Sequence, residues 1–211
     1  MALDTAFERE LAAVGRRFHA RGWVLGTSGN FSRVISKKPL MIAITATFVD
    51  KAELHHRHIL RINERGERVG RGTKRTSAES LLHLEIVRQR GAGAVLHTHS
   101  VWATMLSDAH SANGGVAIEG YEMLKGLAGV TTHAHTEWVP IVANDQDMKR
   151  LSRVVGETLE KNPGAHAVLL RRHGLYTWGA SLAEAVRHVE VLEFLFETIG
   201  RSAAYAGKEA R

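Results

Sequence analysis

A short apolar run that ends in two histidines strongly limits what this chain can fold into. The run is Ala94-Val95-Leu96, and His97-Thr98-His99 follows it directly. On an extended strand, side chains two residues apart point to the same face, so both imidazoles would face one point in space. A divalent transition metal needs such a pair of ligands. The chain has 13 histidines, so the pair could also be the ordinary end of a buried strand.

Length and charge exclude several classes of protein. The chain has 211 residues, 44% of them hydrophobic, which is enough for one buried core, and we expect a single domain over residues 1–211. The net charge of +6 comes from scattered lysines and arginines. The densest basic stretch, residues 68–75, contains no aromatic residue. We therefore expect binding of small anions such as phosphates and no nucleic-acid partner.

The absence of cysteine excludes disulfides and thiolate metal ligands, and it fits a reducing compartment. The first 17 residues carry charges throughout, which argues against a signal peptide. No stretch approaches the roughly 20 apolar residues of a membrane span. We expect a cytoplasmic protein with no membrane partner.

Helical and extended patterns alternate along the chain. Apolar residues at helical spacing (Leu3, Phe7, Leu11, Val14 and Phe18) predict a first helix, and apolar runs predict strands at 41–47, 59–63, 139–142, 165–170 and 175–178. Residues 76–79 and 181–184 have the Ser/Thr-x-x-Glu form of a capping box, Asn144 is the expected cap of another helix, and 121–127 is expected to be helical. These elements predict a single layered α/β domain, and the pattern leaves the strand directions open.

His173 is the best candidate for a third metal ligand. It follows the apolar strand 165–170, as His97 follows its own strand, so neighbouring strands would bring three imidazoles to one sheet edge. Gly174 beside it would permit a tight approach. Two histidine clusters compete. Residues 55–58 (His-His-Arg-His) place a cation between the imidazoles, and His133-Ala134-His135 has no apolar strand leading into it.

Two turns and two acids complete the candidate site. The turn at 26–30 and the helix start at Ser77 could both bind an anion through backbone N–H groups. Glu79 could be a plain capping carboxylate or a site residue. Glu122 lies among apolar residues, where a partly apolar site would raise its pKa and suit it to proton transfer. It could also be an ordinary surface residue.

Four motifs together resemble the class II aldolase/adducin family over nearly the whole chain. They are Gly29-Asn30, Ser77-Ala78-Glu79, His97-Thr98-His99 and Arg172-His173-Gly174-Leu175. The resemblance implies an α/β fold with a central, largely antiparallel sheet flanked by helices. It implies one Zn²⁺ per subunit on His97, His99 and His173. It also implies a homotetramer with active sites at subunit interfaces. By the same analogy, a substrate phosphate binds at Gly29, Asn30, Thr47 and Ser77.

Within this family, stretches 91–100, 121–126, 137–141 and 173–179 are most similar to the sugar-phosphate dehydratases. These carry a glutamate, assigned as the acid/base, at the place of Glu122, where the aldolases tend to carry a tyrosine. The implied reaction is loss of water through a metal-stabilised enediolate. Glu79 is implied to be a second base or a resting-state metal ligand. The alternatives are an aldolase or epimerase on another sugar phosphate or free sugar, and a non-catalytic, adducin-like interaction domain.

One position departs from the family pattern. The second strand usually ends in a Ser-Gly or Thr-Gly pair, but here Thr47 is followed by Phe48. Phe48 replaces a glycine whose backbone would lie against the phosphate. We therefore expect its bulk to disturb that side of the phosphate site.

Overall fold

Residues 6–209, the part of the chain that the computed structural model describes, fold around a central sheet. Within these residues the sheet has nine strands in the order β4-β3-β2-β1-β5-β9-β8-β7-β6. Seven of the neighbouring pairs are antiparallel, and only β7 and β8 run parallel. The prediction of a largely antiparallel sheet is therefore confirmed. The strands are β1 (Asn30–Lys37), β2 (Leu40–Thr45), β3 (Ile59–Asn63), β4 (Arg68–Val69), β5 (Ala94–Thr98), β6 (Gly115–Ile118), β7 (Glu137–Val142), β8 (Ala167–Leu170) and β9 (Gly174–Gly179).

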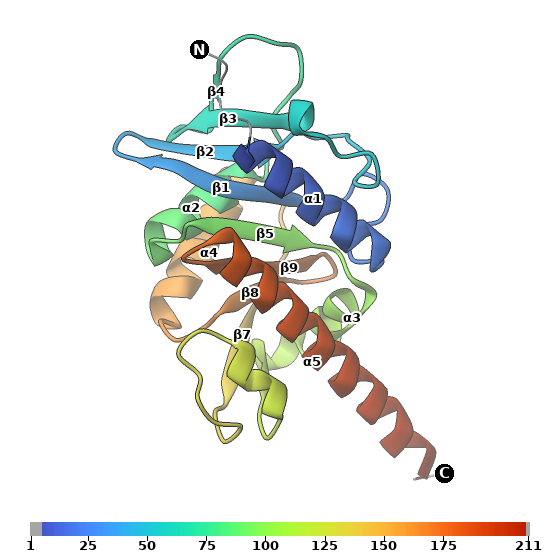
Figure 1. Ribbon diagram of the computed structural model, residues 1–211. Coiled ribbons are helices and arrows are strands. Elements are labelled where there is room, and N and C mark those ends of the chain that lie inside the picture. Colours follow the sequence, from blue (N-terminus) through green and yellow to red (C-terminus); the bar gives the residue numbers. More distant parts are fainter. Residues whose placement is uncertain (1–5, 210–211) are drawn as a thin grey trace.

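Helices cover both faces of the sheet. Helices α1 and α5 lie on one face and α2 and α4 on the other, while the end of α5 projects beyond the sheet (Figure 1). Leu3, expected at the start of the first helix, lies outside the described residues. No helix among the described residues is long and apolar enough to cross a membrane. The helices are α1 (Ala6–Ala20), α2 (Ser80–Arg90), α3 (Val101–Ala109), α4 (Met148–Lys161) and α5 (Leu182–Glu209), with short 3-10 turns η1 (His56–His58), η2 (Ser111–Asn113) and η3 (Glu122–Gly126).

Strand β5 is the fifth of the nine strands and is buried along its whole length. Its side chains alternate between the two cores, as the strand period requires. Ala94 and Leu96 belong to the core under α1 and the start of α5, whereas Val95 belongs to the core under α2 and α4. His97 follows Val95 by two residues. The alternation therefore turns His97 toward the face that α2 covers.

The ends of the helices differ in part from the predictions. The capping box at 76–79 is wrong, because α2 begins at Ser80 and the Glu79 side chain makes no capping bond. Helix α4 is capped by Asp147, whose Oδ1 accepts from the N–H groups of Lys149 and Arg150 at 3.0 and 3.1 Å, and not by Asn144. At α5 the Ser181 Oγ does accept from a backbone N–H, that of Glu184, at 3.2 Å. The expected helix at 121–127 is the short turn η3.

Candidate metal centre and phosphate pocket

Three imidazoles converge where β5 ends and β9 begins, as the sequence predicts. The Nε2 atom of His97 lies 2.8 Å from that of His99 and 3.3 Å from that of His173, and the His99 and His173 Nε2 atoms are 3.2 Å apart. Two nitrogens bound to one tetrahedral zinc ion with bonds of about 2.0–2.1 Å would lie about 3.3 Å apart. The spacing of the three atoms therefore fits one shared ion.

The other ring nitrogens fix the direction of the lone pairs. The Nδ1 of His97 is 2.9 Å from the carbonyl oxygen of Leu175, and the Nδ1 of His173 is 3.2 Å from the Asn144 Oδ1. Both partners are acceptors, so both Nδ1 atoms carry the proton and both Nε2 atoms present lone pairs to the centre. Facing lone pairs repel one another unless a cation lies between them. This arrangement is that of a metal site, with the orienting hydrogen bonds that metal-binding histidines require.

Glu79 adds a carboxylate to the three imidazoles. Its Oε1 lies 3.2 Å from the His173 Nε2 and 3.7 Å from the His97 Nε2. One ligand atom from each of the four residues lies within 4.8 Å of the others, and no other such group occurs among the described residues. Glu79 is thus a member of the cluster and not a plain capping residue. The four side chains together could hold a divalent metal ion.

The protonation states at neutral pH suit metal binding. Burial, together with the neighbouring His99, lowers the pKa of His97 well below its usual value, and burial and His173 lower that of His99 to about 4. Burial alone would raise the pKa of Glu79, but the nearby His173 and His97 and the hydrogen bond from Asn30 bring it well below the ordinary carboxyl value. His97 and His99 are therefore neutral and Glu79 is ionised, which are the forms that bind a cation.

A cavity of about 100 Å³ adjoins the cluster. Glu79 and His99 of the cluster form part of its wall. All four residues expected at the phosphate lie in the same wall, from the 26–30 turn, the segment after β2 and the segment before α2: Gly29, Asn30, Thr47 and Ser77. The structure therefore places the expected anion-binding residues next to the candidate metal ligands.

Two glycines allow the chain to approach the cluster closely. Gly29 has a φ of +72°, and a Cβ there would meet the backbone oxygen of His97 at 2.7 Å. A Cβ on Gly174, beside His173, would lie 2.0 Å from the backbone oxygen of Thr98. Neither contact can be relieved without moving backbone. Glycine at these positions is therefore needed for the 26–30 turn and for β9 to pack against the end of β5.

Phe48 was expected to disturb one side of the phosphate site, but its ring lies outside the cavity. Phe48 is 82% exposed and does not form part of the cavity wall. Its φ of +58° is in the left-handed region that favours glycine, so the backbone keeps the turn while the ring projects into solvent. The bulk of Phe48 is accommodated outside the site.

Glu122 does not join the cluster within this chain. It lies on η3, its side chain is 72% exposed, and its carboxylate pairs with the Lys125 Nζ at 2.6 Å and the His133 Nδ1 at 3.7 Å. The expectation of a raised pKa in a partly apolar site is wrong for the single chain. The hydrogen bond from Lys125 and the charge of that lysine lower the pKa of Glu122 instead.

The competing histidine clusters form no metal group in the described part of the chain. In the 133–135 pair, His135 bonds through its Nε2 to the buried Glu137 carboxylate at 3.0 Å. In the 55–58 stretch, the His58 Nδ1 accepts from the backbone N–H of His55 at 3.2 Å. Both clusters therefore have structural partners of their own.

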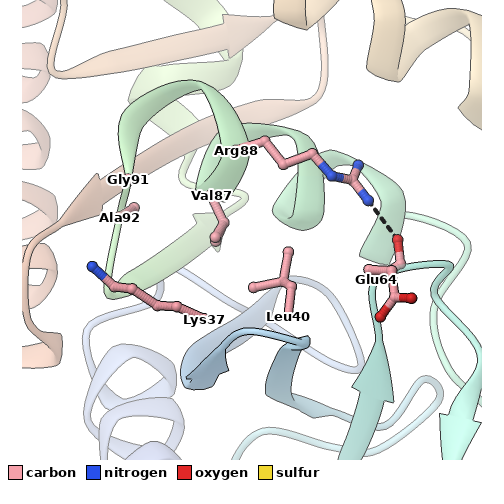
Figure 2. Close-up of a pocket in the computed structure, with 7 residues that line it drawn as sticks. All are labelled: Lys37, Leu40, Glu64, Val87, Arg88, Gly91 and Ala92. Atoms are coloured by element: carbon pink, nitrogen blue, oxygen red, sulfur yellow. Dashed lines mark hydrogen bonds between the residues drawn. The ribbon is translucent and has the colours of Figure 1, made fainter.

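A larger pocket, of about 370 Å³, lies between the C-terminal end of α2 and the β1–β2 hairpin. Figure 2 shows Leu40 and Val87 side by side in it, and the Arg88 guanidinium donating to the Glu64 backbone oxygen, at 2.5 Å. None of the cluster residues lines it. Size therefore does not identify the candidate site in this chain, and side-chain chemistry does.

Comparison with known proteins agrees with this geometry. The family described as "Class II Aldolase and Adducin N-terminal domain" matches residues 9–199. The chain belongs to this family. An L-fuculose-1-phosphate aldolase of Thermus thermophilus is similar in structure, with a TM-score of 0.75, 25% identity and coverage of 96% of this chain and 98% of that one. A sugar-phosphate aldolase from Thermotoga maritima shares the fold at a TM-score of 0.72, with 20% identity and coverage of 94% and 95%.

Curated relatives in this family are closer in sequence. A methylthioribulose-1-phosphate dehydratase of Parvibaculum lavamentivorans is 46% identical over 184 residues, which is 87% of each chain. One of Methylococcus capsulatus is 44% identical over 198 residues, covering 92% of this chain and 94% of the relative. The similarity therefore extends over most of both chains.

Four buried polar residues around the cluster were not found from the sequence. Tyr176, His83, Lys51 and Glu193 are all at most 2% exposed. Each sits in an otherwise apolar or mixed stretch, and each bonds or stacks with residues far away in the chain. The one signal in the sequence was a polar residue at a position where the apolar pattern predicts a buried side chain.

Proposed function

We propose that this protein is a zinc-dependent methylthioribulose-1-phosphate dehydratase, a lyase of methionine salvage. The observation that carries the proposal is the cluster of Glu79, His97, His99 and His173 beside a cavity that Asn30 and Ser77 help to line. The named relatives at 44–46% identity support the choice of reaction. The substrate would be 5-methylthioribulose 1-phosphate and the product 2,3-diketo-5-methylthiopentyl 1-phosphate.

His97, His99 and His173 would hold one zinc ion per subunit, with Glu79 next to it. When bound, zinc supplies Lewis acidity that polarises the substrate carbonyl and makes the neighbouring C–H group more acidic. Nitrogen and carboxylate ligands without thiolates suit this ion among others.

The other residues bind the substrate and move protons. Gly29, Asn30, Thr47 and Ser77 would bind the phosphate in the cavity, which orients the sugar chain toward the cluster. The reaction removes the proton on C3 and the hydroxyl on C4 as water, and the resulting enol becomes the diketone. Glu122 would transfer these protons, since a positioned carboxylate can act as acid and base in turn. Glu79, ionised at neutral pH, would be a second base or a resting-state metal ligand.

We further propose that the protein acts as a homotetramer in which Glu122 serves the site of a neighbouring subunit. Two observations support this arrangement. Glu122 is exposed and lies outside the cluster of its own chain. Three large apolar side chains on α3 and α5 are also half exposed or more: Val101, Met105 and Phe194. Helices α3 and α5 are in contact, and exposed apolar side chains gathered on neighbouring helices are typical of surfaces that bind another chain. A cytoplasmic location fits a cysteine-free enzyme acting on a phosphorylated metabolite.

The test supplies 5-methylthioribulose 1-phosphate to the zinc-loaded protein and follows formation of the diketone. We expect turnover by the wild type and a loss of about 10²-fold or more in Glu122→Gln. Glu157→Gln, an exposed glutamate on α4, is the matched control and should keep full activity. A wild type that binds zinc but leaves this substrate unchanged would contradict the dehydratase assignment. A screen of sugar phosphates for aldol cleavage or epimerisation would then follow. Protein that binds no zinc would instead favour the interaction domain.

A subunit-mixing experiment tests the position of Glu122. Glu122→Gln and His99→Ala chains are each expected to be inactive alone. If Glu122 acts across an interface, co-expressed tetramers contain sites built from one intact half of each chain and regain part of the activity. Mixed chains that stay inactive, while forming tetramers, would place Glu122 in the site of its own subunit.

A further inference from the structure

His83 is a fully buried histidine in the first turn of α2, and it bonds through both ring nitrogens. Its Nδ1 lies 2.7 Å from the Ser32 Oγ, and its Nε2 makes a short hydrogen bond with the Asn30 Oδ1. Asn30 and Ser32 are two residues apart on β1, so they face α2 together. The imidazole is therefore held at both ends by one strand.

The direction of each hydrogen bond follows from the one partner that can only accept. The Asn30 Nδ2 donates to the Glu79 Oε2 at 2.5 Å, since an ionised carboxylate has no proton to give. The amide oxygen of Asn30 is then the atom that faces His83, and it needs a donor. The Nε2 of His83 is therefore the donor, and a neutral imidazole, which carries one proton, has none left on Nδ1. Its Nδ1 must accept, and Ser32 donates.

A chain of hydrogen bonds thus runs from Ser32 through His83 and Asn30 to the Glu79 carboxylate. Asn30 also lines the cavity next to the cluster, and Glu79 lies 3.2 Å from the His173 Nε2. If the Asn30 amide rotated by half a turn, its oxygen would face the carboxylate. Two acceptors would then repel each other, and Glu79 would move away from the three imidazoles.

We propose that His83 is a positioning residue that fixes the orientation of the Asn30 amide and so holds Glu79 at the candidate metal centre. This inference rests on the metal site of the proposed function. His83 contacts neither the imidazoles of the cluster nor the cavity. It reaches the Glu79 side chain through Asn30, and its other ring contact is edge-on with Tyr176, at 5.7 Å between ring centroids. It thus links the expected phosphate position to the expected metal position.

Two amide substitutions separate the contacts of the ring. In His83→Gln the side-chain NH₂ can take the place of Nε2 and still donate to Asn30. In His83→Asn the shorter side chain can reach only the place of Nδ1, so the contact with Ser32 remains and the contact with Asn30 is lost. Zinc affinity is measured by competition with a chromogenic chelator, and metal-free melting temperatures show whether both variants fold.

We expect His83→Gln to bind zinc within about threefold of the wild type and His83→Asn to bind about 10- to 100-fold more weakly, the usual cost of losing a partner that orients a ligand. Equal weakening in the two variants, or none in either, would overturn the inference. Failure of the wild type to bind zinc would overturn both the inference and the proposed metal site, so the two failures are distinguishable.

A second measurement keeps the test valid if His83→Asn is less stable. In a Glu79→Ala background there is no carboxylate to position, so adding His83→Asn should weaken zinc binding no further. Coupling of this kind is the mark of residues that act through one another. The same loss in both backgrounds would show that His83 supports the fold in general and would overturn the inference.

Discussion

The ring of Tyr176 lies flat against the imidazole of His97, with ring centroids 3.8 Å apart and planes tilted by only 11°. Tyr176 is on β9 and His97 is opposite it on β5, so the pairing of the two strands sets the stack. His97 is thereby held between this ring and the hydrogen bond to Leu175. The orientation of one candidate ligand thus depends on an aromatic residue outside the cluster.

Replacing Tyr176 with leucine should weaken zinc binding. The change removes the stack, and we expect about a tenfold or greater loss of affinity, as for other supports of metal ligands. It should also reduce the free energy of unfolding of the metal-free protein by about 2 kcal/mol, since a buried aromatic side chain is shortened. Chelator competition and urea unfolding measure the two effects. Tyr176→Phe keeps the ring and is the control, and a loss equal to that of leucine would contradict the role of stacking.

Acid should destabilise the metal-free protein between about pH 6.5 and 4. Burial lowers the pKa of His83 to about 4, and burial and His173 do the same for His99. The unfolded chain takes up these protons first, at a pKa of about 6.5, so stability present above that pH is lost as pH falls. Each shift corresponds to on the order of 3 kcal/mol at most. Urea unfolding at pH 7 and pH 4.5 measures the loss, which His83→Gln should make smaller. If His83→Gln left the pH dependence of the free energy of unfolding unchanged, His83 would not be a source of the acid sensitivity.

Glu193 should have the opposite pH dependence. Its carboxylate, on α5, accepts from the Thr98 Oγ1 at 2.8 Å, and burial raises its pKa to about 7. Because the folded pKa lies above the unfolded one, the folded state holds the proton longer, and stability is lost as pH rises from about 4.5 to 7. We expect Glu193→Gln to remove a penalty on the order of 2–3 kcal/mol between pH 5 and pH 8. The prediction would be refuted if the free energy of unfolding changed equally with pH in the wild type and in Glu193→Gln.

Lys51 should support the cavity. Its buried Nζ donates to the backbone oxygens of Thr27 and Val49, both at 3.0 Å, and so joins the two loops at the cavity wall. Lys51→Met would leave both carbonyls without their donor and loosen the loops. We expect inorganic phosphate to bind about tenfold more weakly by calorimetric titration. Lys37→Met, at the separate pocket beside α2, is the control and should change nothing. An unaltered phosphate affinity in Lys51→Met would rule out the support.

Predictions based on the alternation of side chains along a strand, and on the residues at the ends of strands, were confirmed. The 94–98 strand, its alternation, and the meeting of His97, His99 and His173 followed from two apolar runs that end at the same sheet edge. The capping box at 76–79 failed because the Glu79 carboxylate accepts from Asn30 and lies beside His173 instead of bonding to its own helix. Tertiary partners here outweighed a local motif.

Other residues could not be placed from the sequence because their partners are remote. His83 pairs with a residue 53 positions away, and Glu193 with one 95 positions away, and neither spacing leaves a periodic signal. Glu122 is exposed and pairs with Lys125, which lowers its pKa. The apolar residues next to it in the sequence did not reveal this. The position of the Phe48 ring could not be predicted, because its backbone conformation, and not its size, decides where the ring points.

The central place of β5 in the sheet has a kinetic consequence. Two of the candidate ligands belong to this strand or follow it directly, and β1 and β9 bond to it on either side. Amide protons there should exchange with solvent only when the whole sheet opens. His173 instead sits in the short turn between β8 and β9 and is bonded to the exposed Asn144. An ion bound here should therefore leave by brief opening of that turn, one imidazole at a time, while the other two stay in place.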